Sequence, residues 1–288
     1  MIRLIALDID GTLLGSNGEV PAANRDAIAR AIEAGVEVAI ATGRRYEFAR
    51  SVFERLPAPL TLILSNGAII KNREGETEMR RMLPCAAARA ALEAVPEHRA
   101  SAALIFDRPG ERQVVFESID WNDRRHRLFY AANRAFVCEQ APLEGALDED
   151  PVQLMLTGRC TAMREAYDRL RALAASGSLA AAEMFSVALT EYEYRDFSLV
   201  DVVQSGCSKG TALADLAARR GLAASEVMAV GDNLNDLEML EFAGTPVVMA
   251  NAIPELKARG WAATSSNDDA GVAKAIETFI FAEASYLR

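Results

Sequence analysis

Two aspartates separated by one residue, Asp8 and Asp10, follow the apolar run 2–7 and precede Gly11 and Thr12. An apolar run of this length that ends at a glycine-containing turn predicts a buried strand. Because residues two apart in a strand project the same way, both carboxylates should converge at its carboxyl end. Two carboxylates that close repel each other, so a cation is expected beside them, most simply a divalent metal with oxygen ligands.

Groups that suit a phosphoryl oxygen follow two other predicted strands. The tripeptide Thr42-Gly43-Arg44 comes directly after the apolar run 36–41, and Lys209 follows a later strand. A hydroxyl and backbone N–H groups at the start of a helix bind anions, and a lysine adds a point charge for the same oxygens. These positions therefore indicate a phosphate site.

A second acidic set, with Asp232, Asn235 and Asp236, follows the apolar run 227–230. Asp232 can add a further carboxylate oxygen for Mg²⁺, which prefers a few protein oxygens together with water and phosphate. Each set also has an ordinary interpretation as an exposed turn, a helix cap or a solvated lysine. Their coincidence at the ends of several predicted strands favours one shared site.

The elements that must position these residues alternate between strands and helices. Apolar runs at 2–7, 36–41 and 60–64 predict strands, and two amphipathic helices lie between them. This alternation predicts an α/β fold with a doubly wound parallel sheet, a Rossmann-like core. Ligands of such sheets bind at the carboxyl ends of the strands, which is where the polar sets lie.

The pattern changes over residues 84–196, which predict an inserted α+β cap domain between the core segments 1–83 and 197–288. The parallel pattern is expected to resume near Phe197, with a core strand at 199–203. Inside the insert the sequence predicts an alanine-rich helix, a hairpin and a basic helix, at 86–95, 102–116 and 121–136.

Composition excludes several classes of function. The chain has 288 residues, of which 51% are hydrophobic and 25% charged, so a globular protein is expected. The net charge of −10 argues against a nucleic-acid binder, which needs a basic face. The four cysteines show no paired spacing, so a cytoplasmic location is expected. No apolar run is long enough to cross a bilayer, so no membrane partner is expected. The oligomeric state stays open.

The motifs taken together resemble the haloacid dehalogenase-like phosphohydrolase superfamily. The resemblance rests on Asp8-x-Asp10-Gly11-Thr12, on Thr42-Gly43-Arg44, on Ser208-Lys209-Gly210 and on Gly231-Asp232-Asn233-x-Asn235-Asp236. The placement and size of the insert, and the stretch Ser65-Asn66-Gly67-Ala68, are similar to the Cof-type sugar-phosphatase branch.

The resemblance implies a role for each matching residue. Asp8 would be the nucleophile that forms an aspartyl-phosphate. Asp10 would protonate the leaving alcohol as an acid and then activate water as a base. Asp8, Asp232 and the Asp10 backbone carbonyl would hold Mg²⁺, and Lys209 would offset phosphoryl charge. The remaining residues are expected to bind the phosphate or substrate (Thr42, Gly43, Arg44, Asn66 and Asn235) or to orient the others (Asp236).

The expected reaction is hydrolysis of a small phosphorylated metabolite, such as a sugar phosphate. One alternative is a phosphomutase-like transfer to a sugar hydroxyl, and another is a non-catalytic binding protein with the same fold. Cap-region residues such as Tyr192 and the cluster Arg124, Arg125 and His126 could contact the leaving group, but a solvated surface is the favoured interpretation, and no catalytic role is assigned to them.

Overall fold

The computed structural model describes residues 1–122, 129, 131 and 133–282. Within this described part, the chain forms two compact units. The first, unit 1, contains Met1–Arg80 and Ser208–Arg288, and the second, unit 2, contains Arg81–Cys207. Half of the helix expected at 121–136, residues 123–128, 130 and 132, lies outside the described residues.

Unit 1 is built on a sheet with the order β14-β13-β12-β1-β2-β3-β4-β5, which makes eight strands among the described residues. Neighbours from β14 to β3 are parallel, whereas β4 and β5 extend the edge as antiparallel strands. The prediction of an α/β fold with a parallel sheet is therefore confirmed. The strands are β1 Leu4–Leu7, β2 Glu37–Ala41, β3 Thr61–Leu64, β4 Ile69–Asn72, β5 Thr77–Arg80, β12 Val227–Gly231, β13 Thr245–Val248 and β14 Ala262–Ala263.

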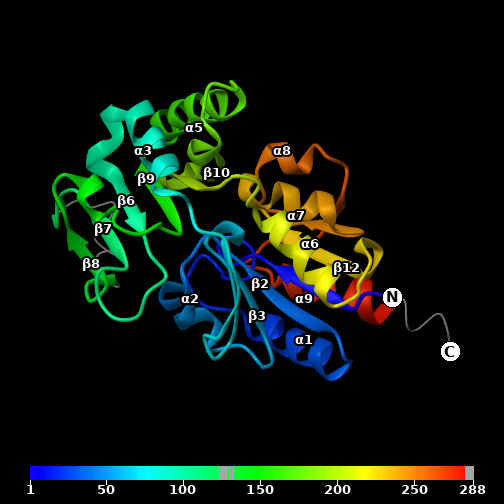
Figure 1. The fold of residues 1–288 in the computed structure, drawn as a ribbon. Helices are drawn as coiled ribbons and strands as arrows, with labels where there is room; N and C mark the ends of the chain where they lie inside the picture. The colour runs from blue at the N-terminus through cyan, green and yellow to red at the C-terminus, as the bar shows by residue number, and fades with distance from the viewer. Residues whose placement is uncertain (123–128, 130, 132, 283–288) are drawn as a thin grey trace. The chain divides into compact units, whose positions relative to one another are not determined.

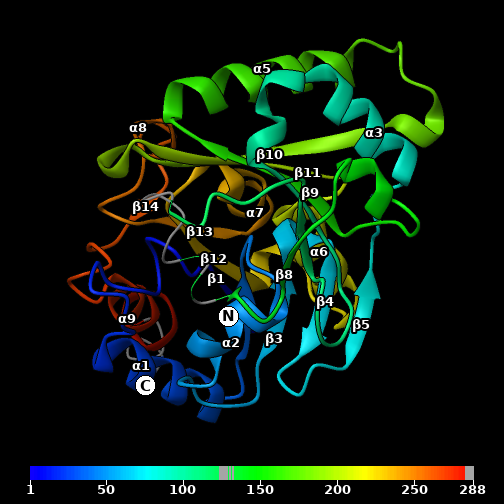
Figure 2. The same ribbon diagram turned by 90° about the vertical axis from the view of Figure 1, so that its left-hand side faces the viewer.

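Helices cover both faces of this sheet. Helix α1 packs against α9 on one face, and α6 packs against α7 on the other (Figures 1 and 2). Right-handed crossovers that run in opposite directions from the central strands put helices on opposite faces. The helices are α1 Ala22–Glu33, α2 Tyr46–Phe53, α6 Lys209–Arg219, α7 Leu237–Phe242, α8 Pro254–Lys257 and α9 Gly271–Ile276.

The centre of the sheet forms the core of unit 1. Strand β1 is buried along its whole length and lies between β12 and β2. A strand buried on both faces reads as a continuous apolar run, which is why the sequence predicts it well. This central place holds the residues that follow β1 in fixed positions.

Unit 2 is an α+β unit, as expected for the insert. Its sheet has the order β10-β11-β9-β6-β7-β8, with all described neighbours antiparallel except the parallel pair β7 and β8. Helices α3 and α5 pack on this sheet. The elements are α3 Cys85–Ala94, β6 Ala102–Ile105, β7 Val114–Phe116, β8 Val137–Glu139, β9 Gln153–Gly158, α5 Cys160–Ala175, β10 Phe185–Tyr192 and β11 Phe197–Gln204.

Both boundaries of the insert differ from the prediction: the first moves only from 83 to 80, and the second moves by more than ten residues. The strand expected to return the chain to the parallel core, β11, pairs antiparallel with β10 and β9 and so belongs to unit 2. The turn at Glu193–Arg195 and Asp196, which has a φ of 46°, folds β11 directly back on β10. An apolar run predicts a buried strand but not its sheet, so the expected boundary at 197 was wrong and the core resumes at Ser208.

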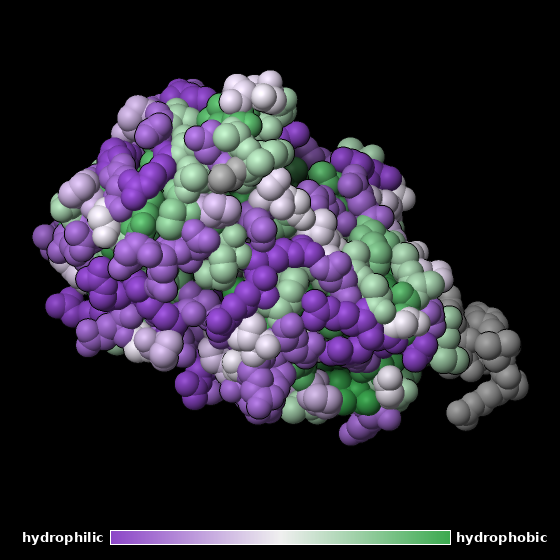
Figure 3. All heavy atoms as spheres, in the orientation of Figure 1, coloured by the Kyte–Doolittle hydropathy of each residue, from purple (hydrophilic) through white to green (hydrophobic). Residues whose placement is uncertain are grey.

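The view in Figure 3 is largely hydrophilic, with apolar residues in small patches. Among the described residues, the exposed large hydrophobic side chains are those of Met1, Trp121 and Met184. No helix in the described ranges combines the length and apolar character needed to cross a bilayer.

Candidate active site

The polar residues predicted at strand ends meet at one edge of the unit 1 sheet. Strands β12, β1, β2 and β3 are parallel neighbours, so their carboxyl ends share that edge. Asp8 follows β1, Asp232 follows β12 and Thr42 follows β2. The sheet therefore brings together residues that lie more than two hundred positions apart in the chain.

Lys209 is the charged centre of the site. Its Nζ donates to Asp8 Oδ1 at 2.7 Å and to Asp236 Oδ1 at 2.6 Å, and the lysine side chain is 0% exposed. It is the first residue of α6, where Ser208 caps the helix by accepting from the Thr211 backbone N–H. The cap fixes the start of α6, and from this position the lysine reaches Asp8 and Asp236.

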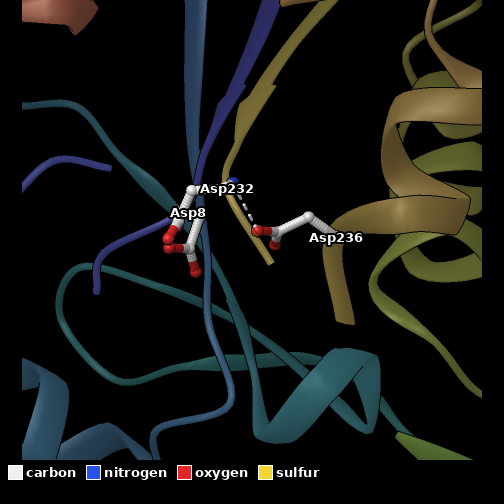
Figure 4. Close-up of side chains that lie close together, drawn as sticks. All are labelled: Asp8, Asp232 and Asp236. Carbon is white, nitrogen blue, oxygen red and sulfur yellow. Dashed lines mark hydrogen bonds between the residues drawn. The ribbon is translucent and has the colours of Figure 1, made fainter. Parts of the chain in front are cut away.

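Three buried carboxylates, those of Asp8, Asp232 and Asp236, form the acidic part of the site. One oxygen from each lies within 4.8 Å of the others among the described residues (Figure 4). Asp236 Oδ2 also accepts from the backbone N–H groups of Asp232 and Asn233, at 3.0 and 3.1 Å. Both Asp236 oxygens are thus engaged, which suits a residue that orients its neighbours, as the sequence predicts for it.

The charge of this cluster is unbalanced. Burial, Asp236 and Asp10 raise the pKa of Asp8 to about 7, although Lys209 opposes the rise. Burial and the nearby Asp8 and Asp236 raise the pKa of Asp232 well above its ordinary value, although the hydrogen bond from Thr12 opposes this rise. Burial disfavours the charged form of Lys209, but Asp236 and Asp8 outweigh it and raise the lysine pKa.

The residues present fit a divalent cation with oxygen ligands. Three carboxylates face one ammonium, so the cluster carries an excess of two negative charges when all groups are ionised. A divalent ion bound by Asp8 and Asp232 would remove that excess, and with it the repulsion between carboxylates that adds to burial in raising the two pKa values. The Asp10 side chain lies outside this cluster, which is compatible with the expectation that only its backbone carbonyl binds metal.

Two glycines allow the carboxylates to approach the backbone. Gly11 has a φ of +89°, and a Cβ there would lie 2.2 Å from Asp232 Oδ2. A Cβ at Gly231 would lie 2.7 Å from Asp236 Cγ. A side chain at either position would displace an aspartate, which explains why a glycine stands in each motif.

The phosphate-binding candidates lie on the neighbouring loops. Thr42 is 1% exposed, and its Oγ1 accepts from the Arg44 backbone N–H at 3.1 Å. Asn235 Nδ2 donates to Asn66 Oδ1 at 3.1 Å, and Asn66 is 1% exposed with a φ of 53°. A Cβ at Gly43 would lie 3.2 Å from the Asn66 amide atoms, so the glycine makes room for it. The predicted residues are thus neighbours.

Arg44 contacts Asp10, the second aspartate of the first motif. Its Nε and Nη2 donate to the two oxygens of the Asp10 carboxylate, at 2.8 and 2.6 Å. This contact is an ion pair. The assignment of Arg44 to phosphate binding stays a prediction.

Two residues that contribute to the site were not predicted from the sequence. Thr12 is 0% exposed and donates from Oγ1 to Asp232 Oδ1 at 3.0 Å. Asn251 donates from Nδ2 to the Gly11 carbonyl at 2.7 Å. Thr12 is part of the first motif and its hydroxyl was a usable signal, whereas nothing in the sequence around Asn251 indicates its role.

The cap-region candidates receive no role at this site. Arg124, Arg125 and His126 lie outside the described residues, and Tyr192 is the last residue of β10 in unit 2.

The chain is similar to known proteins in both sequence and fold. Residues 5–276 match the sequence model of a family described as haloacid dehalogenase-like hydrolase. The 5-amino-6-(5-phospho-D-ribitylamino)uracil phosphatase YwtE of Bacillus subtilis is 27% identical over 97% of this chain and 98% of its own. The pyridoxal phosphate phosphatase YbhA of Escherichia coli is 28% identical over 95% and 97%. A solved phosphatase, BT1666 of Bacteroides thetaiotaomicron, has a TM-score of 0.74 and 25% identity, and the match covers 97% of this chain and 95% of that one.

Proposed function

Because the chain belongs to the haloacid dehalogenase-like hydrolase family, in its Cof-type sugar-phosphatase branch, and is a phosphoric monoester hydrolase, we propose that it is a Mg²⁺-dependent phosphatase. Its substrates would be small phosphorylated metabolites. The reaction would proceed through an aspartyl-phosphate on Asp8. The observation that carries the proposal is the buried contact of Asp8 with Lys209, beside Asp232 and Asp236.

In the first step, an Asp8 carboxylate oxygen attacks phosphorus and the bond from phosphorus to the ester oxygen breaks. The electron pair goes to the leaving oxygen, which takes a proton from the Asp10 carboxyl group. In the second step, water attacks the phosphorus of the aspartyl-phosphate while Asp10 takes the water proton. The bond to Asp8 breaks, and orthophosphate and the free carboxylate result.

Within the described part of the chain, two side chains have donors to spare for the phosphoryl oxygens. A lysine ammonium has three N–H donors, and Lys209 uses two of them on Asp8 and Asp236, so one is left for a phosphoryl oxygen. The Thr42 hydroxyl accepts from the Arg44 backbone and keeps its own O–H for donation. Both groups would stabilise the charge that grows on these oxygens during transfer.

Asp8, Asp232 and the Asp10 carbonyl would hold Mg²⁺, with Asp236 fixing the backbone beside them. When bound, the ion would supply a positive charge against the phosphoryl oxygens.

The substrate class is supported by two relatives, whose names give a phosphorylated ribitylamino-uracil and pyridoxal phosphate as substrates. Both are small phosphate monoesters. All residues assigned to the chemistry belong to unit 1, so we assign unit 1 the role of catalytic core and unit 2 that of cap domain. We also propose a cytoplasmic location, which the four free cysteines support.

The test compares Asp8→Asn with wild type on an aryl phosphate, with Mg²⁺ and with EDTA. The wild type should release orthophosphate only with the metal, and Asp8→Asn should lose on the order of 10⁴-fold or more of kcat, since the nucleophile is missing. The matched control is Asp26→Asn on the exposed side of α1, which should keep wild-type activity.

A second readout locates the intermediate. Rapid acid quench followed by borohydride reduction should label Asp8 in the wild type. Undiminished activity of Asp8→Asn, or a label on another residue, would contradict the proposal. Product analysis with a sugar bisphosphate separates hydrolysis, which releases orthophosphate, from the phosphomutase-like alternative, which yields an isomer.

A further inference from the structure

The ion pair of Arg44 with Asp10 is the contact that the proposed reaction does not yet use. Arg44 Nε donates to Asp10 Oδ2 at 2.8 Å and Arg44 Nη2 to Asp10 Oδ1 at 2.6 Å. The two contacts are the parallel fork that arginine makes with a carboxylate and that lysine cannot make. The geometry therefore fixes the plane of the carboxylate as well as its place.

Asp10 needs such an anchor more than its neighbours do. The side chain of Asp10 is 32% exposed, whereas that of Asp8, two residues before it, is 7% exposed, and Thr12, two residues after it, is buried. Packing holds the two neighbours, but an exposed carboxylate samples several rotamers unless a partner restrains it. The backbone at Asp10 is tied down by its bridge to Leu14, so the remaining freedom lies in the side chain.

Arg44 is itself well restrained. Its Cζ lies 4.6 Å from the centroid of the Phe48 ring, and Nη1 donates to the Phe48 carbonyl at 3.5 Å. Its backbone N–H donates to Thr42 Oγ1. With 15% of its side chain exposed, Arg44 is partly buried and held in place, two residues before the first residue of α2.

We propose that Arg44 is a positioning residue that acts through Asp10, holding the carboxyl group where it can meet the leaving oxygen and then the water. This inference rests on the proposed function and replaces the phosphate-binding role expected for Arg44. Because the two N–H groups contact different oxygens, one contact can open when a proton occupies that oxygen while the other keeps the carboxyl group in place.

The dependence of the rate on the leaving group tests this role. The value of kcat/KM depends only on the steps up to release of the alcohol, and not on the later hydrolysis of the aspartyl-phosphate. An alkyl phosphate needs a proton from Asp10 in that step, whereas a nitrophenyl phosphate does not, because nitrophenolate leaves unprotonated. Arg44→Met should lower kcat/KM for the alkyl ester on the order of 10²-fold and for the aryl ester by less than about threefold.

A double-mutant cycle asks whether Arg44 acts through Asp10. In an Asp10→Asn background, Arg44→Met should change kcat/KM for the alkyl ester by less than about threefold, because the acid it would position is gone. Arg44→Lys should fall between wild type and Arg44→Met, since one ammonium cannot hold both oxygens. The matched control is Arg50→Met; Arg50 lies in α2, pairs with Glu54, and its replacement should leave both esters unaffected.

The aryl ester also reports whether each variant is folded. Equal losses for both esters in Arg44→Met, or a full further loss in the Asp10→Asn background, would overturn the inference and restore phosphate binding as the role of Arg44. A wild type with no activity on any ester would instead overturn the proposed function, and this inference with it.

Discussion

Lys209→Met in the metal-free protein is the sharpest test of the site's electrostatics. Lys209 is 0% exposed and lies between Asp8 Oδ1 and Asp236 Oδ1, whose side chains are 7% and 0% exposed. Methionine keeps most of the buried stem but removes the charge, so two carboxylates stay buried without their cation. Removing one partner of a buried ion pair typically costs about 3–5 kcal/mol in unfolding free energy.

That loss is large enough to measure by urea or thermal denaturation in EDTA. For a folding unit of this size, 1 kcal/mol shifts the midpoint by about 2–4 °C, so Lys209→Met should melt roughly 6–20 °C below the wild type. Lys257→Met, on the exposed side of α8, is the control and should stay within about 0.5 kcal/mol of wild type.

The double variant Lys209→Met/Asp236→Leu identifies the cause. If the loss comes from an uncompensated buried charge, removing Asp236 as well should recover at least about 1 kcal/mol relative to Lys209→Met. A loss below about 1 kcal/mol in the single variant, or a double variant no more stable than the single one, would refute the reasoning from charge balance.

Three further predictions follow from particular contacts. Gly11→Ala should weaken Mg²⁺ binding in isothermal titration calorimetry, because its Cβ would lie 2.2 Å from Asp232 Oδ2. Thr12→Val should lower the unfolding free energy in EDTA by about 1–3 kcal/mol, because a buried Asp232 oxygen loses its donor. In unit 2, the hydrogen bonds from Arg99 lower the pKa of Glu144 to about 2, so their stabilisation is present above the ordinary glutamate pKa and is lost as pH falls from about 4.5 towards 2. Arg99→Met should therefore flatten the dependence of the urea midpoint on pH in that window.

The first two of these predictions have a control in the same chain. Gly18 has a φ of +76° with no atom within 4 Å of its would-be Cβ, so Gly18→Ala tests backbone strain alone and should leave Mg²⁺ affinity unchanged. Thr12→Ser keeps the hydroxyl and should recover most of the loss. Equal Mg²⁺ affinities for the two glycine variants, or equal stabilities of Thr12→Val and Thr12→Ser, would contradict the assigned contacts. If Arg99→Met left the dependence of the urea midpoint on pH unchanged, the contact assigned between Arg99 and Glu144 would also be contradicted.

The sequence alone was enough to predict the parallel core and to identify Asp8, Lys209 and Asp232 as neighbours. The physical reason is that a fully buried strand must be apolar along its length, so each strand and its end can be read from the chain. Parallel strands share one carboxyl edge, and polar residues placed directly after several such strands therefore meet whatever the loops between them do.

Other features depended on which partner each group finds in the folded chain. The apolar run of β11 fits either sheet, and its pairing with β10 and β9 was decided by the tight turn before it. Likewise, an arginine at position 44 can meet a phosphate or a carboxylate, and only the tertiary structure sets it against Asp10. Sequence patterns report burial and local conformation, whereas the choice among chemically equivalent partners depends on distances that long-range packing sets.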